Sequence, residues 1–266
     1  MQTTDSRTFL ASVHEDARER RPARERGAKA WTPLFVVASP RPQVGKTFVA
    51  RLVTDFLRLD GGIAEAFDLN PNETALADLL PLVTSKADIG STQGQMALFD
   101  RLIVDDGVPK VVDLGHTLFE RFFALTKEIG FIEEAARRAL EPLILFAADP
   151  HPASSRAYLE LQERFADALV VPVFNHAILK GRRLRDAFPF ARAAAVPLQI
   201  PLLPPALKLH ADQMTRSFAD FHSQLPVEIP IGHAFELRSW TKRAFLEFRE
   251  LELRVLLEKL RASLES

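Results

Sequence analysis

The sequence predicts an α/β fold in which a doubly wound, mainly parallel sheet lies between two layers of helices. Two observations support this prediction. Short apolar segments alternate with helical segments from residue 34 onward, and the first apolar segment leads through a loop into an amphipathic helix. Such alternation is typical of parallel sheets that are covered on both faces. The length of 266 residues is sufficient for one such domain with extensions.

The expected strands are short and apolar, and each is followed by a loop or a helix. They cover residues 34–39, 63–68, 110–114, 142–148, 168–174 and 196–200. The expected helices cover residues 46–59, 73–83, 95–104, 117–138, 153–165, 180–187 and 205–221. In parallel sheets of this kind, ligands bind at the carboxyl ends of the strands. We therefore expect the functional site at that edge of the sheet, where Lys46, Asp68, Asp113 and Asn175 fall.

Residues 1–30 are expected to form a charged, flexible tail that precedes a folded domain over residues 31–232. The segment from His14 to Lys29 mixes acidic and basic residues around Pro22, which is typical of a mobile segment. A basic arm that contacts DNA or lipid is the alternative. Four acidic residues dilute the positive charge that such an arm would need: Glu15, Asp16, Glu19 and Glu25.

A long C-terminal helix is expected over residues 233–266, after a segment that contains Pro226, Pro230 and Gly232. Its apolar residues recur at helical spacing between about 235 and 264, with Arg and Glu between them. We interpret it as a terminal helix that packs on the domain. A dimerisation or partner-binding helix and a membrane-surface helix are the alternatives. Its acidic residues would oppose anionic lipid: Glu247, Glu250, Glu252 and Glu258.

The composition excludes several classes of protein. With 34 basic and 35 acidic residues, the net charge of −1 demands neither nucleic acid nor membrane as a partner. The absence of Cys excludes disulfides and thiolate metal sites. We find no signal peptide and no apolar run of about 18 residues, so we expect a cytoplasmic protein without a transmembrane segment. The His residues lack zinc-site spacing, and Ser154-Ser155 lacks the setting of a catalytic serine.

The segment LFVVASPRPQVGKTFVAR, residues 34–51, has the frame of a phosphate-binding loop. Its strand is followed by Gly-Lys-Thr at the start of a helix, although Pro40 replaces the first Gly of the Walker A pattern. In such loops, backbone N–H groups and the Lys bind the phosphates, and the Thr hydroxyl binds Mg²⁺. This motif predicts a P-loop NTPase-like three-layer sandwich and an ATP site. The expected ATP-binding residues here are Val44, Gly45, Lys46, Thr47 and Phe48.

Acidic residues end two of the expected strands. Asp68 ends the strand 63–68, and Asp113 lies in the strand 110–114, two residues before Gly115. A carboxylate at the end of a strand beside a phosphate-binding loop is suited to hold Mg²⁺. We therefore expect Thr47, Asp68 and Asp113 to bind the metal. The alternative for each Asp is a role as a helix cap or turn residue.

The order of VGKT, DLNPN, VVDLG, VFN and IPLLP along residues 34–205 resembles the ParA/MinD group of deviant Walker-type ATPases. Dethiobiotin synthetase is a more distant parallel through its own VGKT loop. The resemblance implies a homodimer that holds ATP and Mg²⁺ between its protomers, slow hydrolysis used as a switch, and a protein partner or activator. It also implies that Asp113 is the Walker B aspartate, that Asn175 contacts adenine and that Pro201 lines the adenine pocket.

The chain departs from this group at the positions that control hydrolysis. Where the group has KGGVGKT, residues 41–47 read RPQVGKT, so that its signature lysine falls on Arg41 and its glycines on Pro42 and Gln43. Arg keeps the charge but has a larger planar head, so it is not equivalent to Lys at a tight phosphate site. The second carboxylate of the group's DxD motif falls on Asn70, which can orient a water but cannot act as a base. We assign catalytic positions to Lys46, Asn70 and Arg41 and expect ATP binding to survive better than hydrolysis.

Two functional hypotheses follow. In the first, the chain is an ATP-binding switch with slow or impaired hydrolysis that dimerises to position or regulate a partner, such as a partitioning, conjugation, secretion or polysaccharide-export machinery. In the second, it is a non-hydrolysing regulatory or scaffold subunit that retains the fold. A ligase of the dethiobiotin-synthetase type is a third reading. A basic stretch could make weak, non-specific contact with DNA, or it could form a solvated helix face. Its residues are Lys180, Arg182, Arg183 and Arg185.

Overall fold

A parallel sheet of seven strands forms the centre of the protein in the residues that the computed structural model describes, which are 31–70, 76–180, 188, 196–213, 217–219 and 229–265. The strands are β1 (Thr32–Ala38), β2 (Glu65–Leu69), β3 (Thr84–Lys86), β4 (Lys110–Leu114), β5 (Leu140–Ala147), β6 (Leu169–Asn175) and β7 (Leu198–Ile200). Their order across the sheet is β3-β2-β4-β1-β5-β6-β7, with every neighbouring pair parallel. The predicted α/β three-layer fold is confirmed.

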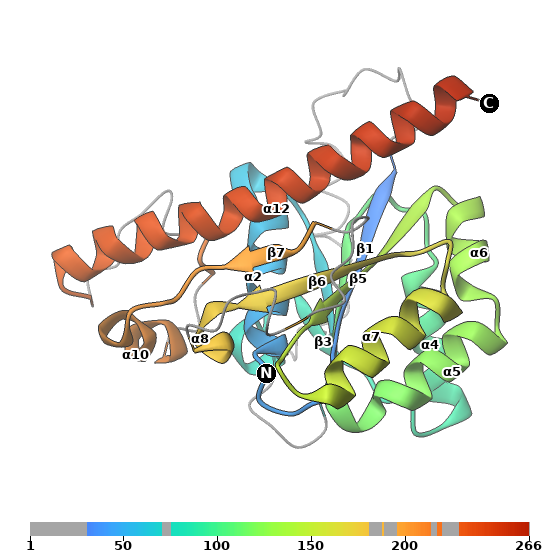
Figure 1. Cartoon of the computed structure of the whole chain (residues 1–266), viewed down its shortest axis with the longest axis horizontal. Coiled ribbons are helices and arrows are strands. Elements are labelled where there is room, and N and C mark those ends of the chain that lie inside the picture. The colour runs from blue at the N-terminus through green and yellow to red at the C-terminus, as the bar shows by residue number, and fades with distance from the viewer. Residues whose placement is uncertain are drawn as a thin grey trace, which may run out of the picture. The chain divides into compact units, whose positions relative to one another are not determined.

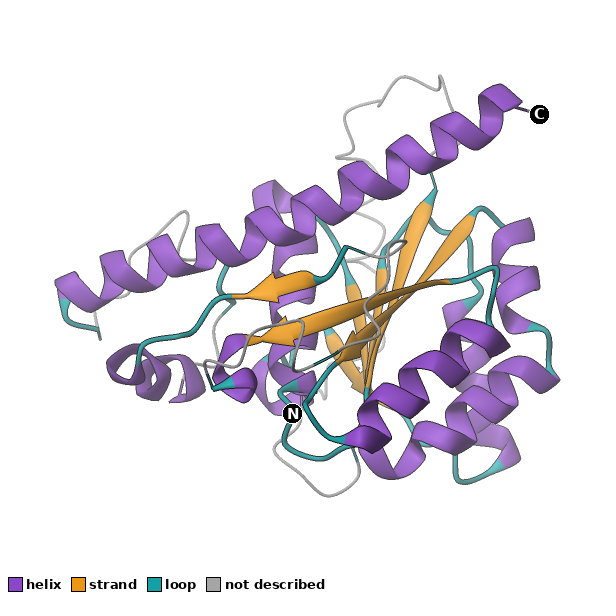
Figure 2. Ribbon diagram, viewed as in Figure 1, coloured by secondary structure: helices purple, strands orange, loops and turns teal. Residues whose placement is uncertain are grey.

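Helices cover both faces of the sheet (Figures 1 and 2). They are α2 (Lys46–Leu57), α3 (Leu76–Leu79), α4 (Thr92–Leu102), α5 (Phe119–Glu128), α6 (Phe131–Arg137), α7 (Pro152–Arg164), α8 (His176–Leu179), α10 (Pro205–Gln213) and α12 (Ile231–Glu265). Residues of α4, α5, α6 and α7 share one hydrophobic core with the sheet. Residues of α2, α10 and α12 share a second core on the other face.

The central strand β1 shows why the sheet needs cover on both sides. Leu34, Val36 and Ala38 belong to the first core, whereas Phe35 and Val37 belong to the second. Successive side chains of a strand point to opposite faces, so an apolar run without alternation leaves no face for solvent. This strand therefore lies in the middle of the sheet, with β4 on one side and β5 on the other.

Several expected elements differ from the observed ones. The three-residue strand β3 was not expected, because its polar sequence Thr-Ser-Lys lies at the edge of the sheet and is largely exposed. The single helix expected over residues 117–138 is wrong, because the chain turns at Gly130 with φ 62° and separates α5 from α6. The helix expected to reach residue 221 ends as α10 at Gln213, and Phe218 lies in a turn.

Other expectations concern residues outside the described part of the chain. These are the flexible tail over residues 1–30 and most of the helix expected over residues 180–187. Of that helix, the structure describes Lys180, which ends α8 in a left-handed conformation with φ 48°. The expected helix over 73–83 is represented by the short helix α3, since residues 71–75 are also outside the described part.

The C-terminal helix packs on the sheet domain through one face. Trp240, Leu237 and Phe248 are almost fully buried and belong to the core that includes α2 and β7. Helix α12 is part of the unit formed by residues 31–266, and it starts at Ile231, four residues before the periodic pattern in the sequence. Among the described helices, none is both long enough and apolar enough to cross a membrane.

Candidate functional site

The loop between β1 and α2 has the backbone conformation that a phosphate-binding loop needs. Gly45 precedes α2 in the left-handed conformation, with φ 86° and ψ 23°. A Cβ atom at this position would lie 2.6 Å from Asn175 Nδ2, so both the dihedral angles and the close approach require glycine. No side chain caps the first turn of α2, and that turn contains no acidic residue. Its N–H groups are therefore suited to an anion.

Gln43 adopts φ 57° in the same loop. The left-handed region costs a residue with a side chain roughly 1–2 kcal/mol. The loop therefore forms the left-handed turn without glycine at this position, but the turn is less stable than it would be with glycine.

Lys46 lies over the loop that precedes it. Its Nζ donates a hydrogen bond to the backbone oxygen of Arg41 at 2.8 Å, and the residue is 7% exposed. The ammonium group is therefore close to both the loop and the N-terminus of α2, where a phosphate would bring its negative charge. A phosphate oxygen could take the place of this carbonyl oxygen as an acceptor.

Two carboxylates lie side by side at the carboxyl edge of the sheet. Asp68 on β2 and Asp113 on β4 are neighbours in the parallel pairing of these strands, and both are buried. Asn70 joins them, since its Nδ2 donates to Asp68 Oδ1 at 3.0 Å and to Asp113 Oδ2 at 2.8 Å. Asp68 also accepts hydrogen bonds from the backbone N–H groups of Asn70 and Ala77. Both Asp68 oxygens are therefore occupied by protein donors.

Asp113 differs from Asp68 in having one oxygen that remains available. Asp113 Oδ1 is buried and accepts no hydrogen bond from any residue in the described part of the chain. Burial raises the pKa of Asp113 to about 7; the Asp68 carboxylate adds to the rise, while the Thr47 hydroxyl, Lys46 and Asn70 oppose it. A cation at Oδ1 would relieve both the desolvation and the repulsion.

These residues fit a magnesium ion that is bound together with a phosphate. Mg²⁺ usually takes only one or two protein ligands and completes its shell with phosphate oxygens and water. Asp113 Oδ1 and the nearby Thr47 hydroxyl could supply the protein side of such a shell. Asp68 is also an expected ligand, but both of its oxygens accept hydrogen bonds from protein donors, so it is less suited than Asp113 to bind the ion directly. In the described ranges, no three His, Asp or Glu side chains form a metal cluster on their own.

Arg41 is paired within the chain. Its Nε lies 3.3 Å from Asp149 Oδ2, and the Arg41 side chain is 38% exposed. Asp149 is fixed in turn, because its Oδ1 accepts a hydrogen bond from the N–H of His151 and its own N–H donates to Ser154 Oγ. The sequence analysis missed Asp149. It follows strand β5 in the same way that Asp113 ends β4, so the same rule applied to the next strand would have found it.

The expected adenine-binding residues also lie at this edge of the sheet. Asn175 ends β6, and its Oδ1 accepts a hydrogen bond from the N–H of Ala177 while its Nδ2 lies against Gly45. Pro201 follows β7 beside it, and its backbone oxygen accepts a hydrogen bond from Trp240 Nε1 at 3.1 Å. Phe48 packs against Trp240, with ring centroids 5.7 Å apart. Its side chain is thus partly buried against the core.

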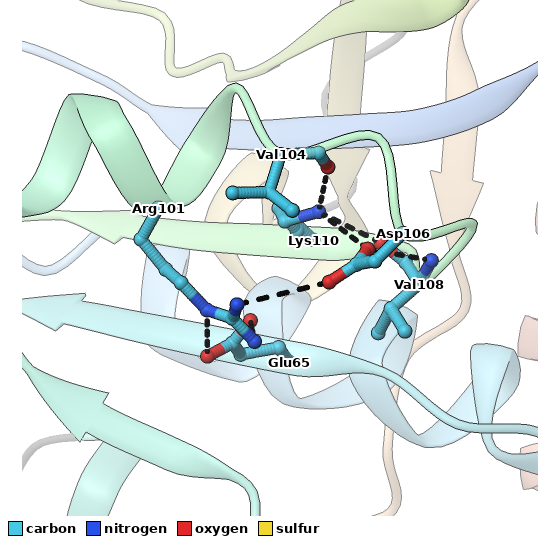
Figure 3. Close-up of polar contacts among 6 residues, drawn as sticks. All are labelled: Glu65, Arg101, Val104, Asp106, Val108 and Lys110. Carbon is cyan, nitrogen blue, oxygen red and sulfur yellow. Dashed lines mark hydrogen bonds and ion pairs between the residues drawn. The ribbon is translucent and has the colours of Figure 1, made fainter. Parts of the chain in front are cut away.

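A second cluster of charged side chains lies at the opposite, amino edge of the sheet (Figure 3). Lys110 at the start of β4 is buried, and its Nζ donates to Asp106 and to the backbone oxygens of Val104 and Val108. Arg101 forms an ion pair with Glu65 at the start of β2, at 2.8 Å. Each of these cations is therefore next to a carboxylate.

The basic stretch proposed for DNA contact is outside the described residues, except for Lys180. Comparison of the sequence with known protein families and with curated proteins gives no match. The functional conclusion therefore depends on the geometry of the loop and the carboxylates.

Proposed function

We propose that this chain is an ATP-binding switch of the ParA/MinD type, which binds ATP with Mg²⁺ at the loop between β1 and α2. In this proposal, ATP binding drives the formation of a homodimer that positions or regulates a protein partner. Two features support the proposal together. One is the left-handed turn at Gly45 before an uncapped helix, and the other is Lys46 folded over that turn.

The observation that carries the proposal is the buried Asp113 oxygen without a hydrogen-bond donor. A buried carboxylate oxygen without a partner is unfavourable in a folded protein. Asp113 adjoins a second carboxylate and the Thr that follows the phosphate-binding lysine. A magnesium ion bound with a nucleotide would explain why this arrangement is retained.

Hydrolysis is expected to be slow. Asn70 stands where a carboxylate would organise the attacking water, and its amide nitrogen donates to both Asp68 and Asp113. Its role in the proposal is to hold these two carboxylates together, because an amide cannot accept a proton from water. Arg41 would have to leave Asp149 to reach the phosphates of a partner, which is feasible because partly exposed ion pairs contribute little.

A non-hydrolysing scaffold is the second candidate. It is favoured by the hydrogen bond from Lys46 to Arg41, which keeps the lysine occupied without a nucleotide. In this case the nucleotide, if bound at all, would only stabilise the fold. The mass of the protein in solution would then be the same with and without ATP.

The test is isothermal titration of the purified protein with a non-hydrolysable ATP analogue, with and without Mg²⁺. We expect Mg²⁺-dependent binding that the Lys46→Ala variant weakens by roughly 10- to 100-fold, since a hydrogen bond to a charged group contributes about 1.5–3 kcal/mol. Lys127→Ala, an exposed lysine on α5, is the matched control and should bind normally. Absence of binding by the wild-type protein would refute the proposal.

Turnover and mass separate the two candidates. We expect ATP turnover well below about 1 per second, which is the lower end of the usual range for enzymes. We also expect ATP binding to double whatever mass the protein has without nucleotide. Rapid turnover would refute the assignment of Asn70. Binding of ATP without any change in mass would favour the scaffold.

A further inference from the structure

Helix α12 has a second apolar face that is largely exposed to solvent. Five leucines on this face are between 50 and 87% exposed: Leu246, Leu253, Leu257, Leu260 and Leu264. At about 100° per residue, they lie on the side of the helix opposite the buried residues Leu237, Trp240 and Phe248. A surface helix with one apolar face packed on its domain does not need a second one.

The exposed leucines follow the spacing of a coiled coil. The steps from Leu253 to Leu257, Leu260 and Leu264 alternate between four and three residues, and Leu246 precedes Leu253 by one heptad. Glu250 occupies the remaining position of this stripe. Such a pattern forms a continuous seam for another helix. We refer to residues 246, 250, 253, 257, 260 and 264 as the leucine seam.

We propose that the leucine seam binds a second copy of this chain, through an antiparallel coiled coil of two α12 helices. This inference does not rest on nucleotide binding, because none of the seam residues belongs to the proposed ATP site. The seam faces away from its own domain. The two domains would therefore lie on opposite sides of the helix pair and would not collide.

The charges along the seam select the antiparallel arrangement. In a parallel pair, Glu250 would face the partner's Glu250, and Arg249 would lie beside the partner's Arg254, so like charges would meet twice. In an antiparallel pair that joins Leu257 to the partner's Leu253, Glu250 instead faces the partner's Leu260. Glu247 then lies beside the partner's Arg261, which gives two symmetric pairs of opposite charge. One like-charge contact remains in this arrangement, between Arg254 and the partner's Arg254, but Arg254 Nη1 donates a hydrogen bond to the Val196 oxygen of its own domain.

The antiparallel arrangement also uses Leu256, which is 43% exposed on the flank of the seam. This residue lies within one position of the two-fold axis, so it meets the partner's Leu256. Its contact would extend the apolar seam at the centre of the pair, where Leu253 and Leu257 also meet their counterparts. The apolar contacts are thus concentrated where the two helices cross the symmetry axis.

The first test measures the mass of the full chain by light scattering at micromolar concentration, without nucleotide. Omitting nucleotide removes any association that ATP drives, so a failure here does not bear on the ATP site. We expect twice the chain mass of 29.8 kDa. The Leu253→Glu, Leu257→Glu double variant should halve this mass, and Leu82→Glu, at a position that is 94% exposed elsewhere, should not change it. A wild-type protein that is monomeric at this concentration would overturn the proposal.

The second test fixes the direction of the helices. The chain contains no Cys, so single cysteines can be introduced and joined by a short thiol cross-linker. Leu256→Cys should give a cross-linked dimer in high yield and Leu264→Cys should not, because the two ends of an antiparallel pair are far apart. Cross-linking at 264 with none at 256 would overturn the arrangement. Binding to anionic vesicles by a monomer, lost in the Leu253→Glu, Leu257→Glu variant, would show that a membrane covers the seam instead.

Discussion

The two edges of the sheet differ in the charges that lie beside their buried ionisable groups. At the amino edge, Lys110 is buried beside Asp106 and two carbonyl oxygens, and the pKa of Asp106 is lowered despite its burial. At the carboxyl edge, Asp113 is buried beside another carboxylate and its pKa is raised to about 7. The same two strands, β2 and β4, contribute to both clusters.

Under the proposed function, the amino edge serves stability and the carboxyl edge binds the ligand. A buried charge that is paired and hydrogen-bonded keeps its ordinary ionisation and supports the fold. A buried carboxylate next to a like charge is retained at a cost, and such perturbed groups are typical of sites that await a ligand. The predictions below test this distinction, from the largest expected effect to the smallest.

Asp106→Ala should destabilise the protein by about 3 kcal/mol, because it leaves the buried Lys110 ammonium without its carboxylate. Urea denaturation at neutral pH measures the loss. The double variant Asp106→Ala, Lys110→Met removes both charges and should recover part of the loss. A loss below about 1 kcal/mol in the single variant would mean that the two carbonyl oxygens alone satisfy Lys110.

Asp55 tests whether hydrogen bonds and a long ion pair, with Arg58 Nη1 3.9 Å from Asp55 Oδ1, are sufficient to offset burial. It is buried on α2, where it accepts hydrogen bonds from the Ser217 hydroxyl and the Phe218 N–H, yet burial raises its pKa to about 6. The folded chain therefore binds more protons than the unfolded chain between about pH 4 and pH 6. The contribution of Asp55 to stability should fall by up to about 3 kcal/mol as pH rises through this range.

Asp55→Asn cannot ionise and should lack this part of the pH dependence. Urea denaturation of both proteins at pH 4.5 and pH 7, taken as a difference, isolates the contribution of Asp55 from those of other groups. The variant should also have a lower free energy of unfolding by an amount that does not depend on pH, because the amide is a weaker acceptor for Ser217 or Phe218. Identical pH dependence in the two proteins would contradict the raised pKa.

Asp113→Asn should stabilise the protein, whereas Asp106→Ala at the amino edge should destabilise it. Replacing the carboxylate relieves its desolvation and its repulsion by Asp68, so stability at pH 8 should rise by about 1–2 kcal/mol. The same variant should lose the Mg²⁺ dependence of nucleotide binding. Destabilisation by this variant would show that Asp113 is a structural residue like Asp106.

Gln43→Gly should stabilise the protein by about 0.5–1 kcal/mol, because glycine adopts the observed φ of 57° without strain. Thermal unfolding measures the gain, and Pro42→Gly at the neighbouring position is the control that should not stabilise. Nucleotide affinity should stay the same in Gln43→Gly, since the loop conformation does not change. Destabilisation would mean that the Gln43 side chain makes a contact that outweighs the strain.

The sequence predicted most of the carboxyl edge because its residues obey local rules. An apolar strand, the Gly-Lys-Thr turn and an acidic residue at the end of a strand can each be recognised in one short segment. Asp68, Asn70, Asp113 and Asn175 therefore fall where they were expected. The occupation of both Asp68 oxygens by Asn70 and Ala77 could not be predicted, because it depends on how the chain folds back after β2.

Other features depend on contacts between distant segments. The Arg41–Asp149 pair requires β5 to lie beside β1, and the hydrogen bond from Trp240 to Pro201 requires α12 to pack on the loop after β7. The strand β3 is too short and too polar to be distinguished from a loop. The break at Gly130 was visible as a glycine, but the periodicity continued across it.

The most direct test of the central claim is a crystal structure with a non-hydrolysable ATP analogue and Mg²⁺. We predict that the triphosphate lies on the N–H groups of residues 44–48, that Lys46 leaves the Arg41 oxygen for the phosphates, and that the ion contacts Asp113 Oδ1. An unchanged loop, with Lys46 still bonded to Arg41 and the analogue bound elsewhere or not at all, would contradict the claim.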